Sequence, residues 1–160
     1  MKFTFIGTSH GVPECNRKCT CTMIEVSGRY YFIDMGTPAN DYLVSNGIDI
    51  HDVKAVFVTH MHGDHTDGLI QFVDLLSWYY TTADPEIYLP DMNAAKVIDD
   101  WLRVTLARMR PIQYREITEG VIFDDGFLKV TSIPTKHCVN SYGYLLEAEG
   151  KKVIFTGDLC

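Results

Sequence analysis

The densest group of metal-binding residue types in the chain is the segment 59–65, which reads Thr-His-Met-His-Gly-Asp-His and directly follows an apolar run typical of a buried strand. Alternate side chains of an extended segment point the same way, so His60 and His62 can face one metal ion. Asp64 and His65 lie just beyond and can face a second. Imidazole suits zinc or iron, while carboxylates suit harder ions or bridge two ions. A loop that is histidine-rich by chance is the alternative, and the density of ligand types argues against it.

This segment resembles the H-x-H-x-D-H signature of the metallo-β-lactamase superfamily, and other parts of the chain resemble further motifs of that family. Ile33–Gly36 is similar to the first motif, in which an aspartate, here Asp34, closes a strand. Pro134–His137 resembles the third motif, and Phe155–Asp158 resembles the fourth. The resemblance implies an α/β (α+β) fold, a metallo-β-lactamase-type αββα sandwich, of which residues 1–160 hold the first half and the start of the second.

The resemblance also implies a site for one or two Zn²⁺ ions, with Mn²⁺ or iron as alternatives. The first ion would be held by His60, His62 and His137, the second by Asp64 and His65, and Asp158 would bridge the two. Asp34 is expected to orient ligand groups, although a turn-capping role is an alternative. Asp64 is also the expected catalytic residue, because it can orient the attacking hydroxide or carry its proton.

The chain ends at Cys160, two residues after Asp158. The family normally supplies one more histidine to the second ion from beyond the fourth motif. We therefore expect a single domain over residues 1–160 that is C-terminally incomplete and holds the first ion better than the second. An inactive, truncated metal-binding fragment is an alternative to an active enzyme. The apolar face of such a half-sandwich could pair with a second copy to form a homodimer.

The chemistry that the resemblance implies is hydrolysis by a metal-activated hydroxide. Residues 5–13 resemble the G-T-x-x-G-x-P loop of the tRNA 3′-processing endonuclease branch and related phosphodiesterases, and Gly7 and Gly11 would bring backbone N–H groups close to a phosphate. Those tRNA nucleases insert a long basic arm between the third and fourth motifs, but only 20 residues separate His137 from Asp158. We therefore predict a phosphodiesterase with a small phosphorylated substrate, such as a cyclic nucleotide or a short oligonucleotide. An ester, thioester or lactone hydrolase of the same fold is the alternative.

Composition agrees with one globular domain, with 160 residues and 46% hydrophobic content. The net charge of −7 opposes indiscriminate binding to nucleic acid. No apolar run reaches the length of a membrane span, so we expect no membrane association and a cytoplasmic location.

The cysteines leave two interpretations open. Cys15, Cys19 and Cys21 could hold a structural zinc with a fourth ligand such as His10, but free thiols are favoured because the spacing is not that of a standard zinc pair. Cys138 directly follows the third-motif histidine and could line the rim of the site, although a small packed thiol is the favoured interpretation.

Hydrophobic periodicity and turn residues predict alternating strands and helices. Strands are expected at residues 2–6, 22–26, 29–34, 53–58, 86–89, 120–123, 127–133, 142–148 and 152–155, and helices at residues 38–46, 67–80 and 92–108. Thr37 and Pro38 favour the start of the first helix, and Asp91 favours the start of the third.

Overall fold

The computed structural model describes residues 1–160 apart from 13, 106–109, 139 and 160. Its elements in chain order are β1 (Lys2–Gly7), β2 (Cys21–Val26), β3 (Arg29–Met35), α1 (Asn40–Ser45), the short 3₁₀ helix η1 (Ile50–Asp52), β4 (Val53–Phe57), α2 (Gly63–Trp78), β5 (Glu86–Leu89), α3 (Asn93–Val104), β6 (Gln113–Glu116), β7 (Gly120–Asp124), β8 (Lys129–Pro134), β9 (Tyr142–Ala148) and β10 (Lys151–Phe155).

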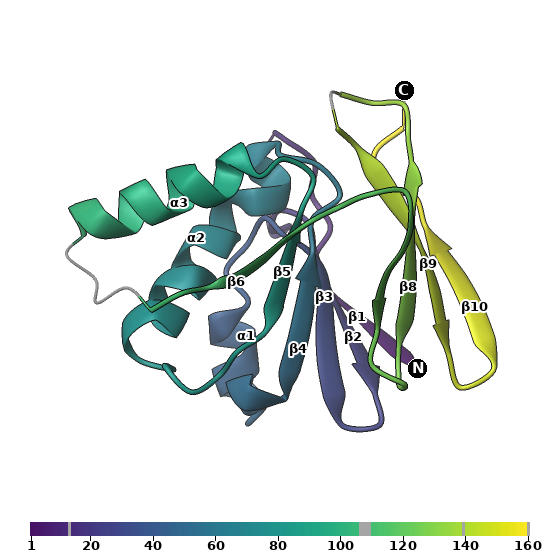
Figure 1. The fold of residues 1–160 in the computed structure, drawn as a ribbon, viewed down its shortest axis with the longest axis horizontal. Coiled ribbons are helices and arrows are strands. Elements are labelled where there is room, and N and C mark those ends of the chain that lie inside the picture. The colour runs from purple at the N-terminus through teal and green to yellow at the C-terminus, as the bar shows by residue number, and fades with distance from the viewer. Residues whose placement is uncertain (13, 106–109, 139, 160) are drawn as a thin grey trace.

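The strands form two sheets that pack face to face. One sheet has the order β1-β2-β3-β4-β5-β6, and the other has the order β10-β9-β8-β7. The helices α1, α2 and α3 lie on the side of the six-stranded sheet that faces away from the second sheet (Figure 1). In the described part of the chain, no helix covers the outer face of the four-stranded sheet (Figure 1). The observed layers are therefore helices, sheet and sheet, as the resemblance predicted for the first half of the sandwich and the start of the second.

Parallel pairing in the six-stranded sheet brings the metal-binding motifs to one edge. β3 pairs parallel with β4, and β4 pairs parallel with β5, whereas β1, β2 and β3 form antiparallel neighbours. Because parallel strands end at the same edge, Asp34 near the end of β3 lies beside the segment that follows β4. The sheet thus places the first two motifs together before any side-chain contact is considered.

Two hydrophobic cores lie on opposite faces of the six-stranded sheet, and alternation along each strand decides which core a residue joins. Phe32 packs with Phe72 and Leu76 against the helices, whereas its neighbour Tyr31 and Tyr144 pack between the sheets. The Tyr144 hydroxyl donates to the carbonyl oxygen of Val58 at 2.5 Å, which joins the second sheet to the end of β4. The Tyr31 hydroxyl donates to Asp125 Oδ2 at 2.7 Å and joins the sheets a second time.

Most predicted strands agree with the structure to within a residue or two, and the helices differ more. α1 begins at Asn40 rather than at Pro38, with Ala39 as an N-cap that makes no side-chain capping bond. α3 ends at Val104, and the predicted end at Arg108 falls outside the described residues. The strand β6 was not predicted, because its residues are mostly polar and its place at the sheet edge comes from pairing with β5.

Within the described residues, no helix is both long enough and apolar enough to cross a membrane.

Candidate metal centre

The histidine segment lies between β4 and α2, and its second half is helical. α2 begins at Gly63 with His62 as its N-cap, so Asp64 and His65 lie in the first helical turn. The sequence predicted an extended turn there and a helix only from Asp67, which is wrong. An aspartate early in a helix interacts favourably with the helix dipole, which supports the earlier start.

His60 and His62 do face the same way, as the alternation of an extended segment predicts. His60 Nε2 and His62 Nδ1 are 3.0 Å apart, and the two ring centroids are 4.6 Å apart. His60 is buried, with 1% of its surface exposed. His137, from the loop between β8 and β9, completes this group, because its Nε2 lies 3.3 Å from His62 Nδ1.

Donor atoms gather in two groups that share His60. In the first group, the donor atoms of His60, His62, His137 and Cys138 all lie within 4.8 Å of one another. The second group contains His60, His65 and Asp158 at the same limit. We call these the first and second donor groups.

The remaining carboxylates lie close to the second donor group. His65 Nε2 is 3.4 Å from Asp64 Oδ2 and 3.6 Å from Asp158 Oδ1. The other oxygen of Asp158 is 3.8 Å from His137 Nε2, so Asp158 lies between the histidines of the two groups. The structure therefore brings together all six residues that the sequence singled out as ligands.

Asp34 anchors this arrangement from beneath. Its carboxylate is fully buried and accepts hydrogen bonds from the Thr59 backbone N–H at 2.7 Å and the Thr59 hydroxyl at 2.9 Å. It also lies 2.8 Å from His65 Nδ1. A proton on Nδ1 that is donated to Asp34 leaves the Nε2 lone pair of His65 free for a metal ion. Asp34 thus orients the His65 ring, and its bond to the Thr59 amide also fixes the loop backbone.

Thr59 extends the same support to His60, a role that sequence reasoning missed. The Thr59 hydroxyl gives its hydrogen to Asp34, so its oxygen can accept from His60 Nδ1, which lies 3.0 Å away. This orientation turns His60 Nε2 toward the first donor group. The sequence signal that could have revealed this role is the position of a hydroxyl residue between the buried strand and the first histidine.

Burial and charge shift the pKa values of the two inner histidines in opposite directions. Burial, together with the neighbouring histidines, lowers the pKa of His60 to about 4, so this ring is neutral near pH 7. Burial also acts to lower the pKa of His65, but the hydrogen bond and charge of Asp34, with Asp64 and Asp158, outweigh it and raise the pKa. Burial raises the pKa of Asp34 as well, against the opposing effect of His65. The carboxylates around His65 favour the protonated form of its ring, and a divalent cation bound there would take the place of that proton.

Two glycines allow the close packing around Asp64. A Cβ on Gly36 would lie 1.7 Å from the Asp64 carbonyl oxygen, so the chain after β3 passes α2 with backbone against backbone. A Cβ on Gly11 would lie 3.7 Å from the Asp64 carboxylate, which places the loop after β1 beside this side chain. The glycine-containing loop thus reaches the candidate metal centre, as its resemblance to a phosphate-binding loop requires.

The two interpretations of the cysteines come out differently. Cys15 is exposed, whereas Cys21 is buried, and burial raises the pKa of its thiol to about 12. No group of three or more donors among the described residues includes Cys15, Cys19 or Cys21, so the geometry does not support a structural zinc there. Cys138, in contrast, belongs to the first donor group, which favours the alternative that it lines the rim of the site.

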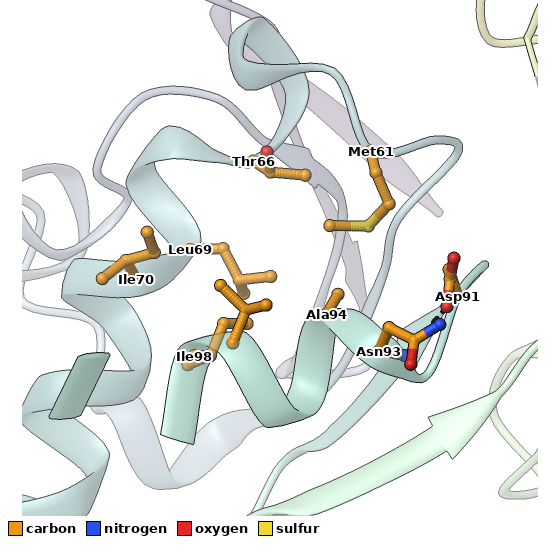
Figure 2. Close-up of a pocket in the computed structure, with 9 residues that line it drawn as sticks. Met61, Thr66, Leu69, Ile70, Asp91, Asn93, Ala94 and Ile98 are labelled. Atoms are coloured by element: carbon orange, nitrogen blue, oxygen red, sulfur yellow. Dashed lines mark hydrogen bonds between the residues drawn. The ribbon is translucent and has the colours of Figure 1, made fainter. Parts of the chain in front are cut away.

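The pocket drawn in Figure 2 is lined by Met61 and by none of the histidines of the segment. It has a volume of about 340 Å³ and lies between the first turns of α2 and α3, with Leu69 and Ile98 in its wall. Met61 points into it (Figure 2). We interpret this pocket as the place where Met61 anchors the histidine segment, and not as the metal cavity. A separate hollow of about 270 Å³ is lined by Thr20, His65 and Asp158 and gives access to the second donor group.

The chemistry and spacing of the donors fit divalent metal ions. Two nitrogens that bind one tetrahedral zinc at about 2.0–2.1 Å are about 3.4 Å apart. The separations of 3.0 and 3.3 Å within the first donor group are close to this value. The second donor group is richer in carboxylate oxygen, which suits harder ions such as Mn²⁺.

The architecture and the spacing of these motifs define a protein of the metallo-β-lactamase fold. Human tRNase Z, short form, matches the structure with a TM-score of 0.82 at 22% identity, over 99% of this chain and 69% of that chain. A diphosphatase from the PhnP family matches with a TM-score of 0.61 at 21% identity, over 90% of this chain and 61% of that chain. The family described as "Anti-Pycsar protein Apyc1" matches residues 1–160, and the chain belongs to this family.

Two curated relatives agree with the branch that the sequence predicted. Ribonuclease BN of Cronobacter sakazakii is 33% identical over 156 residues, which are 94% of this chain and 51% of the relative. Ribonuclease Z of Listeria innocua is 31% identical over 156 residues, which are 95% of this chain and 51% of the relative. The chain thus spans about half the length of the curated relatives that it matches.

Proposed function

We propose that this chain carries the metal-binding part of a metal-dependent phosphodiesterase that acts on a small phosphorylated substrate, such as a cyclic nucleotide or a short oligonucleotide. The observation that carries the proposal is the pair of donor groups that share His60. Two adjacent donor groups are typical of sites in which two metal ions act on one phosphate. The names of the relatives, two ribonucleases and a diphosphatase, support phosphorus rather than carbon as the atom attacked.

The proposed ligand assignment uses the donor groups together with Asp64, which lies beside His65. His60, His62 and His137 would hold the first ion, Asp64 and His65 the second, and Asp158 would lie between them. Zn²⁺ is the proposed first ion because imidazole dominates that group, and Mn²⁺ or iron would suit the second. The Asp34 and Thr59 hydrogen bonds support this assignment, because they leave one ring nitrogen of His60 and one of His65 free to bind.

When bound, two such ions would polarise a phosphate oxygen and lower the pKa of a nearby water molecule. The chain supplies the proton acceptor and the space around it. Asp64 is the proposed catalytic residue, because its carboxylate lies beside both His65 and the Gly11 loop. A phosphate placed there would approach the backbone N–H groups of the glycine loop, which can accommodate negative charge.

Two observations favour a small substrate over a folded RNA. The described chain between the third and fourth motifs is the compact pair β9 and β10, joined at Glu149 and Gly150, with no room for a long arm. The net charge of −7 also disfavours a large polyanion. A metal-filled site can still attract one phosphate, because the ions are the largest local charges.

Hydrolysis assays on the purified chain, loaded with Zn²⁺ or Mn²⁺, test the proposal. We expect turnover of bis(p-nitrophenyl) phosphate and of cyclic mononucleotides, and a loss of about 100-fold or more in the Asp64→Asn variant. Asp67→Asn, in the next turn of the same helix, is the matched control. Turnover of a lactone or thioester without turnover of either phosphodiester would favour the alternative hydrolase and overturn the proposal.

A further inference from the structure

Cys138 is the one member of the first donor group that the family signature does not account for. Its Sγ and the ligand nitrogens of His60, His62 and His137 lie within 4.8 Å of one another. Its side chain is partly buried, unlike the exposed Cys15. The sulfur therefore lies among three imidazoles, in a place where a soft metal ion would meet four donors.

The loop that carries Cys138 is held closed by hydrogen bonds at its base. The Thr135 N–H donates to the Ser141 carbonyl oxygen at 2.9 Å, and the Ser141 hydroxyl donates back to the Thr135 carbonyl oxygen at 2.9 Å. The Ser141 hydroxyl also lies 3.4 Å from the Cys138 carbonyl oxygen. These bonds fix the base of the loop and bring the backbone of Cys138 close to the same hydroxyl, so the fold holds this residue beside His137.

We propose that Cys138 is a metal-selecting ligand of the first donor group, through its sulfur. This inference rests on the metal site proposed above. Three imidazoles and one thiolate are ligand types that zinc prefers, and thiolate favours soft ions over Mn²⁺. Zinc can expand to five-coordinate, so these four donors still allow Asp158 or a water molecule to bind. Binding replaces the S–H bond with a sulfur–metal bond and releases the proton to solvent. The first group therefore selects zinc, while the second group, which lacks a thiol, keeps its affinity for harder ions.

Cobalt substitution tests the sulfur–metal bond directly, without any assay of turnover. The metal-free chain is titrated with Co²⁺ under reducing conditions, and its absorption spectrum is recorded. Visible bands of tetrahedral Co²⁺ report that the ion is bound, and a near-ultraviolet sulfur-to-cobalt charge-transfer band reports that a thiolate binds it. We expect both bands in the wild-type chain and in Cys15→Ser, the matched control. In Cys138→Ser we expect the visible bands without the charge-transfer band.

Competition measurements extend the test to selectivity. We expect Cys138→Ser to weaken Zn²⁺ binding by about tenfold or more and to change Mn²⁺ binding by less than about threefold. In the wild-type chain, Zn²⁺ should also protect Cys138 but not Cys15 from alkylation, as measured by peptide mass spectrometry. That measurement needs no variant, so a folding defect in Cys138→Ser would not remove the test.

The outcomes separate this inference from the proposed function. Co²⁺ binding without a charge-transfer band in the wild-type chain, or equal alkylation of Cys138 with and without Zn²⁺, would overturn the ligand role of Cys138 and leave the metal site intact. A wild-type chain that binds neither Co²⁺ nor Zn²⁺ would overturn the proposed function as well.

Discussion

The two sides of the candidate metal centre are built differently. The segment after β4 holds His60 and His65 in a buried network in which Asp34 and Thr59 bond to the ring nitrogens that face away from the donor groups. The loops of the second sheet hold His137 and Asp158 nearer to solvent, and the Asp158 side chain is 46% exposed. The comparison indicates that the first sheet fixes the geometry of the site through the hydrogen bonds of Asp34 and Thr59, which we call the frame. The second sheet adds the donors His137 and Asp158 to this frame.

The largest expected effect follows from removing the residue that both donor groups share. We expect His60→Ala to lower the metal content of the chain from about one tightly held ion to near zero, because neither group keeps a complete set of donors. Elemental analysis after dialysis measures this. His51→Ala is the control, because His51 bonds to Asp49 and Thr82 away from the site. Retention of the ion in His60→Ala would contradict the assignment of the metal centre.

A smaller effect is expected when the hydrogen bonds of Asp34 to Thr59 and His65 are weakened and every proposed metal ligand is kept. Asn tolerates the left-handed backbone that Asp34 adopts at φ 56°, so Asp34→Asn should fold. Its amide cannot accept from Thr59 and His65 as the carboxylate does, and we expect the affinity for Zn²⁺ to fall about 10–100-fold. Isothermal titration calorimetry measures this change. An unchanged affinity would show that the Asp34 network does not position the ligands.

The smallest effect is expected at the exposed donor on the second sheet. We expect Asp158→Asn to change the affinity of the tightly held ion by less than about threefold and to abolish any weaker second binding step. The same calorimetric titration, run beside Asp34→Asn, compares the two sides of the site. If Asp158→Asn weakened the tight step more than Asp34→Asn did, the proposed division between frame and added donors would be wrong.

The sequence predicted much of this arrangement because the histidine segment carries its information locally. Alternation before Gly63 placed His60 and His62 on one side, and the buried strand before them is β4. The fold resemblance extended the prediction to His137 and Asp158, which local patterns alone could not have joined to the segment. The predicted strands β2 to β5 and β7 to β10 are present because their apolar runs and the turn residues between them are also local signals, and β2 to β5 are buried almost throughout.

The features that the sequence did not predict depend on contacts between distant segments. α2 begins four residues earlier than predicted, because the packing against Gly36 and the dipole of its first turn outweigh the local turn signals. Thr59 has a role only because the parallel pairing of β3 and β4 brings Asp34 to it. Cys138 belongs to the first donor group, whereas the sequence analysis offered a place at the rim of the site only as the less favoured alternative, because spacing along the chain does not show where its side chain points.

The direct backbone contact at Gly36 limits how far the metal-binding motif can be separated from its fold. With no room for a Cβ between Gly36 and the Asp64 carbonyl oxygen, the entry angle of α2 is set by a strand end that lies far away in sequence. Grafting the hexapeptide from His60 to His65 onto another scaffold would therefore transfer the ligands without the entry angle of α2 that sets their relative directions. A portable version of this site would have to include the turn at residues 34–37 as a second inserted segment.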